Sequence, residues 1–511
     1  MRRTSTPGSL HRATPPAPAM PRAPAAPLAL AARLALAFAA PLAVAAAFAL
    51  APSPASAQDT MPPQEYRDLA RQMFAEIIEI NTTNTERGNN TEVARVLERY
   101  LLEAGFPDED VHVLVPDDAP TKGNLVARYR GRDASLEPIL VLAHIDVVQA
   151  LPEDWSSDLD PFTFTERDGY WYGRGVTDDK DEAAIYTANF IRMRDEGFVP
   201  ERDIVMALTA DEEGGPRNGV NFLLEEHRDL IDAAYALNEG GGGMEKDGRK
   251  ISNNVQAAEK KFLNFTFRAT NAGGHSSLPV EKNAIYDLSA ALLAVQEHDF
   301  PVMMHEVTEA YFLGTAEIVG GRVGDAMRRI VENPDDAEAA EILSTEAGYN
   351  ARLRTTCVAT LLEGGHASNA LPQLAEANVN CRIFPTQPWE DVHRALQALA
   401  EPFDVGVEPA GRPTPSPPSP LTAEVLEPIE RITEQMWPGV KVLPVMSTGA
   451  TDGLYLRNAG IPVYGVSGIF GDVDDVRAHG QDERILIEHF YEGQEFLYRL
   501  VKALSGGGVA Q

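Results

Sequence analysis

Five short segments of the sequence concentrate histidine and carboxylate side chains at spacings that could bind a metal ion. The side chains are His144 and Asp146, Asp178 and Asp179, the run Asp211-Glu212-Glu213, Glu239, and His479. Imidazole nitrogens and carboxylate oxygens together form a ligand set that suits zinc. The five segments therefore predict a zinc site.

Each segment also has an interpretation without metal chemistry. A histidine near a strand end, such as His144, is often structural, and paired acids such as Asp178 and Asp179 can cap the helix that they open. The run of three acids can form a solvated turn. The combination favours metal binding, because four consecutive strand ends of one sheet are predicted to deliver a histidine, an aspartate and two glutamates. Ligands of open α/β sheets bind at the carboxyl ends of strands.

The segments that position these side chains alternate between strand and helix patterns. Apolar residues recur at helical spacing or form near-continuous runs, as they do in buried strands. This alternation predicts an α/β domain with a mostly parallel sheet and helices on both faces. Strands are predicted at residues 124–129, 138–148, 203–210, 233–237 and 461–466, and helices at 65–80, 91–104, 179–194, 220–226 and 424–436.

The segment 262–411 has a different order of elements: strand, helix, irregular stretch, two strands, helix and strand. This order resembles an α+β, ferredoxin-like unit inserted into the larger domain. We therefore divide the chain after its first 57 residues into 58–261, the insert 262–411, and 412–511, which begins with a proline-rich linker. Residues 301–353 form an additional stretch within the insert, and the sequence assigns them no role.

The first 57 residues differ in composition from the rest of the chain. They carry five arginines and no acid, with an uncharged apolar run at 34–51 and an Ala-Ser-Ala site that ends at Ala57. This pattern predicts a secretory signal peptide that is cleaved near Ala57, with translation starting at Met1 or Met20. The alternative is an uncleaved N-terminal membrane anchor, because the apolar run is near the lower limit for a span.

The whole chain is acidic. It has 511 residues, with 44 Lys and Arg against 76 Asp and Glu and a formal net charge of −32. Such a charge repels a phosphate backbone, so nucleic acid is disfavoured as a partner. Two cysteines are too few for a disulfide framework or a thiolate zinc cluster.

The two cysteines, Cys357 and Cys381, lie on segments that we predict to be paired strands. An exported chain meets an oxidising compartment, where a disulfide can form. Cross-strand neighbours, however, have Cβ atoms about 4.5–5.5 Å apart, wider than the separation of about 3.8 Å that a disulfide prefers. The sequence therefore favours two free thiols over a disulfide.

The motifs, taken in order, resemble those of peptidase family M20, a family of cocatalytic zinc hydrolases. They are His-x-Asp at 144–146, Gly-Arg-Gly-x-x-Asp-Asp-Lys at 173–180, Asp-Glu-Glu-Gly at 211–214, Asn-Glu-Gly at 238–240 and Ala-His-Gly at 478–480. The resemblance covers residues 65–503, and the insert is similar to the lid domain of that family. Segments 154–162 and 354–365 resemble the carboxypeptidase S branch, which also includes secreted N-fatty-acyl-amino-acid hydrolases.

The resemblance implies which residues bind the two zinc ions. One ion would be bound by His144, Asp178 and Glu239. The other would be bound by Asp178, Glu213 and His479. Asp178 would therefore bridge the two ions, with Co²⁺ or Mn²⁺ as possible substitutes for zinc.

The resemblance also implies the roles of five further residues. Glu212 would be the general base that takes a proton from a water between the metals and passes it to the leaving amine. Asp146 would orient the first histidine ligand. His275 of the lid would stabilise the oxyanion, and in family dimers this histidine reaches the active site of the partner. Asn369 and Arg382 would hold the carboxylate of the substrate.

The resulting prediction is an exported di-zinc hydrolase that cleaves an amide bond next to a free carboxylate. Peptides are the leading substrates, by carboxypeptidase or dipeptidase action, and N-acyl amino acids are the alternative. A remote alternative is an inactive binding protein of the same fold. The resemblance further implies a homodimer that forms through the lid domain.

Overall fold

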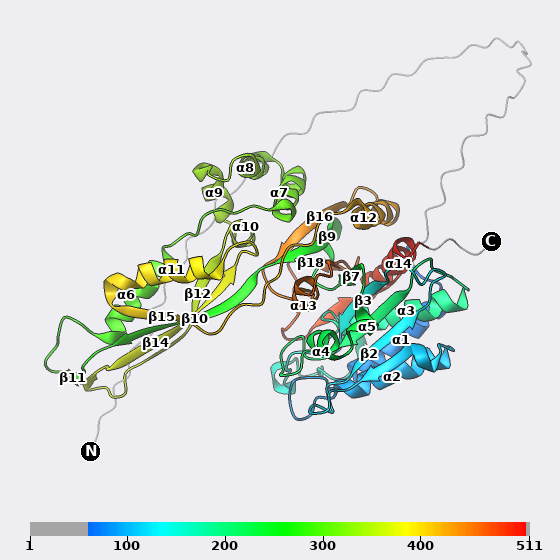
Figure 1. Ribbon diagram of the computed structural model, residues 1–511, viewed down its shortest axis with the longest axis horizontal. Coiled ribbons are helices and arrows are strands. Elements are labelled where there is room, and N and C mark those ends of the chain that lie inside the picture. Colours follow the sequence, from blue (N-terminus) through cyan, green and yellow to red (C-terminus); the bar gives the residue numbers. More distant parts are fainter. Residues whose placement is uncertain (1–59, 507–511) are drawn as a thin grey trace, which may run out of the picture. The chain divides into compact units, whose positions relative to one another are not determined.

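The computed structural model describes residues 60–506 of the chain, and the predicted signal peptide or membrane anchor lies outside them. A ten-stranded sheet and a four-stranded sheet dominate the described part (Figure 1). Within residues 60–506, every helix is too short or too polar to cross a lipid bilayer.

The ten-stranded sheet is parallel at its centre and mixed at its edges. Strands β6, β3, β7 and β17 are parallel neighbours, whereas β1, β2 and β6 pair in antiparallel fashion. Every residue of β3 and β6 is buried, which explains their continuous apolar sequences. In spatial order the strands are β1 (Val111–Leu114), β2 (Asn124–Tyr129), β6 (Ile204–Thr209), β3 (Ile139–His144), β7 (Tyr235–Asn238), β17 (Val463–Gly465), β9 (Arg249–Glu259), β8 (Gly243–Lys246) and β18 (Phe470–Asp472), and β16 (Lys441–Ser447) pairs with β9.

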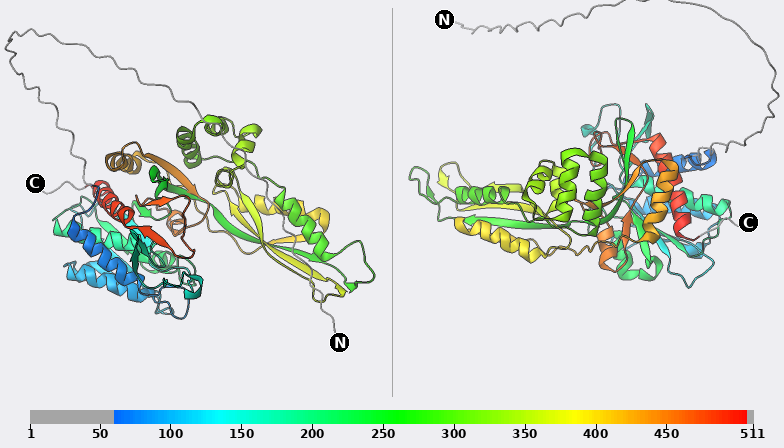
Figure 2. Two further views of the ribbon diagram at one scale, coloured as in Figure 1. Left: turned by 180° about the vertical axis from the view of Figure 1, so that it is seen from behind. Right: turned by 90° about the horizontal axis from the view of Figure 1, so that it is seen from above.

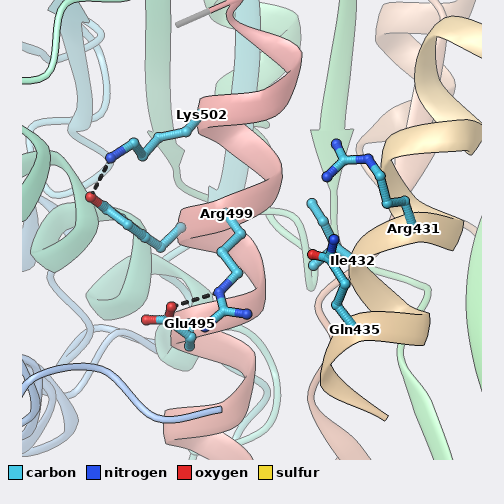
Figure 3. Close-up of a pocket in the computed structure, with 7 residues that line it drawn as sticks. Arg431, Ile432, Gln435, Glu495, Arg499 and Lys502 are labelled. Atoms are coloured by element: carbon cyan, nitrogen blue, oxygen red, sulfur yellow. Dashed lines mark hydrogen bonds and ion pairs between the residues drawn. The ribbon is translucent and has the colours of Figure 1, made fainter. Parts of the chain in front are cut away.

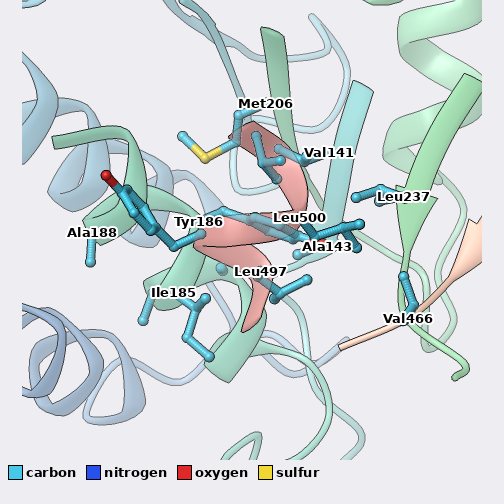
Figure 4. Packing of buried hydrophobic residues seen from close by; sticks show 14 of the residues in the cluster. Val141, Ala143, Ile185, Tyr186, Ala188, Met206, Leu237, Val466, Leu497 and Leu500 are labelled. Atoms are coloured by element: carbon cyan, nitrogen blue, oxygen red, sulfur yellow. The ribbon is translucent and has the colours of Figure 1, made fainter. Parts of the chain in front are cut away.

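Helices cover both faces of this sheet, because successive residues of a strand point to opposite faces. Val141 and Ala143 of β3 belong to the core cluster that includes α3 and α14 (Figure 4), whereas Leu140 and Leu142 belong to the cluster with α4 and α13. The predicted α/β fold with helices on both faces is therefore confirmed. The first cluster contains α1 (Gln64–Ile78), α2 (Asn90–Glu103), α3 (Lys180–Asp195), α12 (Ala423–Met436) and α14 (Ile487–Leu504), and the second contains α4 (Gly219–Glu226), α5 (Arg228–Ile231) and α13 (Gly453–Asn458).

Local sequence signals set the ends of these elements. The side chain of Asn89 accepts the N–H of Glu92 and caps α2 at its start. Gly105 follows the end of α2 with a φ of 86°, a conformation that glycine adopts readily. The predicted helix at 91–104 therefore differs from α2 by only one residue at each end.

The second sheet belongs to a four-stranded unit with its own hydrophobic core. Its strands are all antiparallel, in the order β12-β14-β10-β15, and α6 and α11 pack together against them (Figure 2). Along the chain the unit reads β-α-β-β-α-β. Its elements are β10 (Lys261–Thr270), α6 (Ala284–Gln296), β12 (Thr356–Gly364), β14 (Leu374–Ile383), α11 (Trp389–Ala400) and β15 (Val405–Pro409), extended by the short pair β11 (Gly274–His275) and β13 (Ala370–Leu371).

The additional stretch at 301–353 folds into four helices, α7 (Glu306–Val319), α8 (Gly321–Glu332), α9 (Ala337–Ser344) and α10 (Ala347–Leu353). We call them the inserted helices. Their apolar core includes Leu443 and Val445 of β16, so they pack on a strand of the ten-stranded sheet. Lys441 Nζ of the same strand lies 3.1 Å from Glu317 Oε2 of α7.

A third, three-stranded sheet completes the fold, in the order β19-β5-β4. It pairs residues far apart in the sequence, because Arg484 of β19 lies opposite Tyr172 of β5. Its strands are β4 (Thr165–Arg167), β5 (Tyr170–Tyr172) and β19 (Arg484–Leu486), and short 3₁₀ helices occur at η1 (Asp108–Asp110), η2 (Pro152–Asp154) and η3 (Glu401–Phe403).

The expectation of free thiols was wrong, because Cys357 and Cys381 form a disulfide between β12 and β14. The two residues are direct partners in the strand register, with their Cα atoms 4.1 Å apart. Antiparallel pairs alternate between narrow and wide spacing, and the narrow pairs bring side chains closer than the average on which we relied. Within residues 60–506 no free cysteine remains.

We predict that the unfolded, unreduced protein contains no free thiol in a thiol titration. Cys357→Ser/Cys381→Ser should lower the free energy of unfolding by about 3 kcal/mol, since the bond closes a loop over a sequence separation of 24. Urea unfolding of this variant measures the loss, and the reduced wild type is the control. Two thiols per unreduced chain would contradict the disulfide.

Candidate active site

Three strand ends of the ten-stranded sheet deliver metal-binding side chains to one place. β3 ends at His144, β6 is followed by Glu212 and Glu213, and β7 is followed by Glu239. The ligand atoms of His144, Glu212 and Glu239 lie within 4.8 Å of one another. A second group with the same spacing contains His144, Asp178 and Glu213. The predicted convergence at the carboxyl ends of parallel strands is therefore observed.

Asp178 reaches this cluster by a different route from the one predicted. It follows β5 of the three-stranded sheet, so only three of the four predicted strand ends belong to the large sheet. Asp178 Oδ1 lies 3.0 Å from His144 Nε2, and Oδ2 lies 2.9 Å from His479 Nε2. His479 Nε2 also lies 2.8 Å from Glu213 Oε1. Asp178 thus occupies the central position that a bridging ligand requires.

Burial and hydrogen bonding change the pKa values of the cluster. Burial, with neighbouring carboxylates, raises the pKa of Glu212 to about 9 and that of Glu239 well above its usual range. Burial also acts to raise the pKa of Asp178, but hydrogen bonds from two imidazoles outweigh it, and the pKa is lowered. Hydrogen bonds to Asp178 and Glu213 raise the pKa of His479 to about 10. Glu212 and Glu239 would therefore ionise at neutral pH when positive charge lies beside them.

The cluster contains more buried acid than its own histidines can neutralise. In the first turn of α3, Asp181 Oδ1 and Glu182 Oε2 are buried without a hydrogen-bond partner among the described residues. Burial raises the pKa of both carboxyls well above their usual range. Divalent cations would compensate this charge, and the mixed imidazole and carboxylate donors suit zinc, cobalt or manganese. The residues at this site therefore fit a pair of metal ions that share Asp178.

Asp146 supports the cluster in a way that differs from the prediction. β3 ends at His144, so Asp146 lies beyond the strand, and its main-chain carbonyl is nearer to the imidazole than its carboxylate is. His144 Nδ1 lies 3.1 Å from the main-chain carbonyl of Asp146 but 3.6 Å from Oδ1. The carboxylate of Asp146 instead accepts the N–H groups of Glu212 and Glu213, each at 3.0 Å. Asp146 therefore orients His144 through its backbone and holds the Glu212-Glu213 turn through its side chain.

A buried ion pair that the sequence did not reveal ties two loops of the site together. Glu483 Oε2 accepts a hydrogen bond from Arg174 Nη1 at 2.6 Å. Its Oε1 accepts the N–H and the hydroxyl of Thr177, both at 2.9 Å, and Arg174 Nη2 donates to the carbonyl of Gly480 at 2.9 Å. The loop that precedes Asp178 is thus joined to the loop that carries His479. Charged residues inside the motifs are the only sequence signal for this support, since a buried charge needs a partner.

The three site residues predicted from the insert lie in the four-stranded unit and its extension. Pairing of β11 with β13 brings His275 beside Asn369, whose carbonyl accepts the N–H of Ser276 at 3.1 Å. Arg382 lies on β14, with its guanidinium 5.0 Å from the ring centre of Phe262. Within residues 60–506 no hydrogen bond or ion pair joins these side chains to the metal cluster, so their roles stay predictions.

A cavity of about 920 Å³ adjoins the cluster and includes Asp178, Glu182 and Glu239 in its walls. A smaller hollow of about 360 Å³ lies between α12 and α14 (Figure 3). Its side chains pair among themselves, with Lys502 Nζ donating to Tyr498 and Arg499 to Glu495. Glu495 is the only acid in its lining, so this hollow lacks a metal-binding set.

The comparison with family models decides where the protein belongs. The model of peptidase family M20/M25/M40 matches residues 140–503, more than half of the chain. The chain belongs to peptidase family M20/M25/M40. The resemblance deduced from the motifs is confirmed, and the protein is a hydrolase of the metallopeptidase and amidohydrolase type.

Family relatives are similar over most of their length. The N-fatty-acyl-amino acid synthase/hydrolase PM20D1 of Homo sapiens is 26% identical, over 82% of this chain and 84% of the relative. The solved M20 family metallo-carboxypeptidase of Sulfolobus solfataricus has a TM-score of 0.62 and 16% identity, over 85% of this chain and 99% of the other. A Bacillus subtilis structure described as a dinuclear metal-binding peptidase of the family has a TM-score of 0.53 and 14% identity. The match covers 86% of this chain and 98% of the other. These solved structures share the fold of this chain.

We predict that Glu483→Gln weakens metal binding about 10- to 100-fold without unfolding the protein, because the loops that carry two ligands lose their shared anchor. Competition with a chromophoric chelator measures the affinity, and circular dichroism checks the fold. The matched control is Glu488→Gln, an exposed acid in the first turn of α14. Equal affinities of the Glu483 variant and the wild type would contradict the anchoring role.

Proposed function

We propose that this protein hydrolyses an amide bond next to a free carboxylate, with peptides as the leading substrates, by carboxypeptidase or dipeptidase action. The observation that carries the proposal is the position of Asp178 between His144 Nε2 and His479 Nε2. Glu212 lies in the same cluster, but it is Asp178 and not Glu212 that connects the two imidazoles. The cluster therefore offers a metal centre together with a carboxylate that is available as a base.

Glu212 acts as the general base of the proposed reaction. When bound, two divalent cations supply Lewis acidity, which makes water nucleophilic at neutral pH and polarises the amide carbonyl. Burial keeps the pKa of Glu212 at about 9, so this side chain needs adjacent positive charge to lose its proton at neutral pH. Glu212 then takes a proton from the attacking water and passes it to the leaving amine nitrogen.

His275 is suited to stabilise the oxyanion that forms at the carbonyl carbon. Its Nδ1 accepts the N–H of Ser277 at 3.2 Å, which leaves the ring proton on Nε2. A neutral imidazole with a proton on Nε2 donates a hydrogen bond to an oxyanion. Arg382 and Asn369 would hold the substrate's free carboxylate, for which the guanidinium fork is well shaped.

Two kinds of acyl group are compatible with this chemistry. Peptides are supported by the fold of the Sulfolobus solfataricus metallo-carboxypeptidase. N-acyl amino acids are supported by the similarity to PM20D1, which is an N-fatty-acyl-amino acid synthase/hydrolase. The carboxylate side of the amide is the same in both, so the carboxylate-binding residues serve either substrate. We propose zinc as the metal, since two imidazoles and several carboxylates match its preferences.

We predict that metal analysis gives about two zinc ions per chain and that a strong chelator abolishes activity. Glu212→Gln should retain both ions and lose about 10²- to 10⁴-fold in kcat, because only the proton transfer is removed. Metal content and turnover on dipeptides and N-acyl amino acids are measured together. Glu225→Gln, an exposed acid on α4, is the control. Full activity with one ion per chain would contradict the shared site.

We also propose a homodimer through the four-stranded unit. β12 is an edge strand, and its apolar residues Val358, Leu361 and Leu362 are 57%, 69% and 65% exposed. An exposed apolar edge strand favours pairing with another chain, and a second copy offers the same edge in antiparallel orientation. In such a dimer, His275 would serve the active site of the partner.

We predict that two inactive variants restore activity when they are combined. His275→Ala and Glu212→Ala should each be inactive, but a mixed dimer contains one site with an intact Glu212 and a His275 from the partner. Variants with different affinity tags are mixed, refolded and purified through both tags before the assay. Doubly purified dimers without activity would contradict delivery of His275 across the interface.

Export is the third part of the proposal. The disulfide between Cys357 and Cys381 supports it, because disulfides persist in oxidising compartments. We predict that the protein recovered from outside the cytoplasm begins near Gln58, as determined by N-terminal sequencing. A chain that retains Met1 or Met20 would contradict cleavage.

A further inference from the structure

The inserted helices form part of the wall of the active-site cavity. The cavity of about 920 Å³ is lined by Asp178 and Glu239 on one side and by Gly348 and Arg352 of α10 on another. Its volume is within the range of cavities that bind small molecules. A segment for which the sequence suggested no role therefore contacts the space that a substrate would occupy.

Arg352 is an arginine of this cavity for which the described residues provide no ion pair. Three arginines line it, and two of them, Arg477 and Arg484, form ion pairs with Asp475, each at 2.6 Å. Among the described residues no acid forms an ion pair with Arg352. Carboxylates also line the cavity, but none of them pairs with Arg352 among the described residues, so its guanidinium can bind an anionic ligand.

The guanidinium of Arg352 is held in a fixed position. Its Nη1 donates to the carbonyl of Gly348 at 3.0 Å, and its centre lies 4.9 Å from the ring centre of Tyr311 on α7. Its Nε is buried and has no hydrogen-bond partner among the described residues. A buried group has little room to move, which adds to this fixation. A fixed fork also loses little conformational entropy when it binds a carboxylate.

Two further cations increase the positive potential near Arg352. Lys260 is buried, and its Nζ donates to Thr356 Oγ1 at 3.2 Å, while Thr356 lies opposite Arg382 in the strand register. Burial, with repulsion from Arg352 and Arg382, lowers the pKa of Lys260 to about 7. Neither Lys260 nor Arg382 forms an ion pair within residues 60–506. An anion bound here would relieve the repulsion.

We propose that Arg352 forms a second carboxylate subsite, which selects substrates whose released amino acid has an acidic side chain. This inference rests on the proposed function, in which Arg382 holds the carboxylate next to the amide bond. When Arg382 binds the carboxylate next to the amide bond, the guanidinium of Arg352 is still available to bind a second carboxylate. The preferred substrates are therefore amides of glutamate or aspartate, and the inserted helices supply the residue that selects them.

Matched pairs of substrates test the selection. The wild type should cleave N-acyl or peptidyl glutamate with a kcat/KM about 10- to 100-fold above that of the glutamine analogue, which has the same shape without the charge. Arg352→Gln should remove this preference by raising KM for the glutamate substrate, with the glutamine substrate changed less than about threefold. Arg382→Ala should weaken the binding of both substrates to the same extent. The control is Arg322→Gln, an exposed arginine of the same inserted helices.

A binding measurement separates this inference from the proposed function. Calorimetric titration of the metal-loaded Glu212→Gln protein with N-acetyl-glutamate and N-acetyl-glutamine should show the same preference, and Arg352→Gln in that background should remove it. The second subsite is wrong if the wild type hydrolyses amides without a preference for glutamate. It is also wrong if Arg352→Gln weakens the binding of both ligands equally. In either case the proposed function stands. If binding shows the preference but no amide is cleaved, the proposed function is wrong and the subsite stands.

Discussion

Repulsion among buried carboxylates is the constraint on which the rest of the structure depends. Parallel strands bring Glu212, Glu213 and Glu239 to one edge, and the loop before α3 adds Asp178. Within residues 60–506 two imidazoles, those of His144 and His479, lie among them, and burial raises the pKa of Glu212 and Glu239. Divalent cations, which family members bind, would supply the positive charge that lets these carboxyls ionise together. The proposed metal centre would thus serve the architecture as well as the chemistry.

Much of this architecture could be predicted, because it depends on local patterns. Apolar runs predict β3 and β6, and the helical pattern at 91–104 predicts α2 to within one residue at each end. The candidate metal-binding residues could be picked out because strand ends and motifs occur together in the sequence. Asp178 was placed on the wrong sheet, since an apolar pattern predicts a strand but not the sheet that the strand joins.

The details that were missed all depend on contacts between distant segments. The carboxylate of Asp146 turns toward the Glu212-Glu213 turn, and a strand pattern alone cannot indicate that direction. The disulfide required the exact register of β12 against β14, which decides whether a pair is narrow or wide. The contact of the inserted helices with β16 depends on side-chain packing between separate elements. Sequence periodicity contains no information about any of these pairings.

The pairing of Glu483 with Arg174 has a consequence for how the enzyme matures. The two residues are separated by 309 positions, and His479 enters the site on the same late segment. A growing chain on the ribosome exposes the first ligands long before it contains the last, and contacts of such long range form late in folding. The candidate active site is therefore completed only after the segment that carries His479 and Glu483 has been made. Until then the chain lacks the second predicted imidazole ligand.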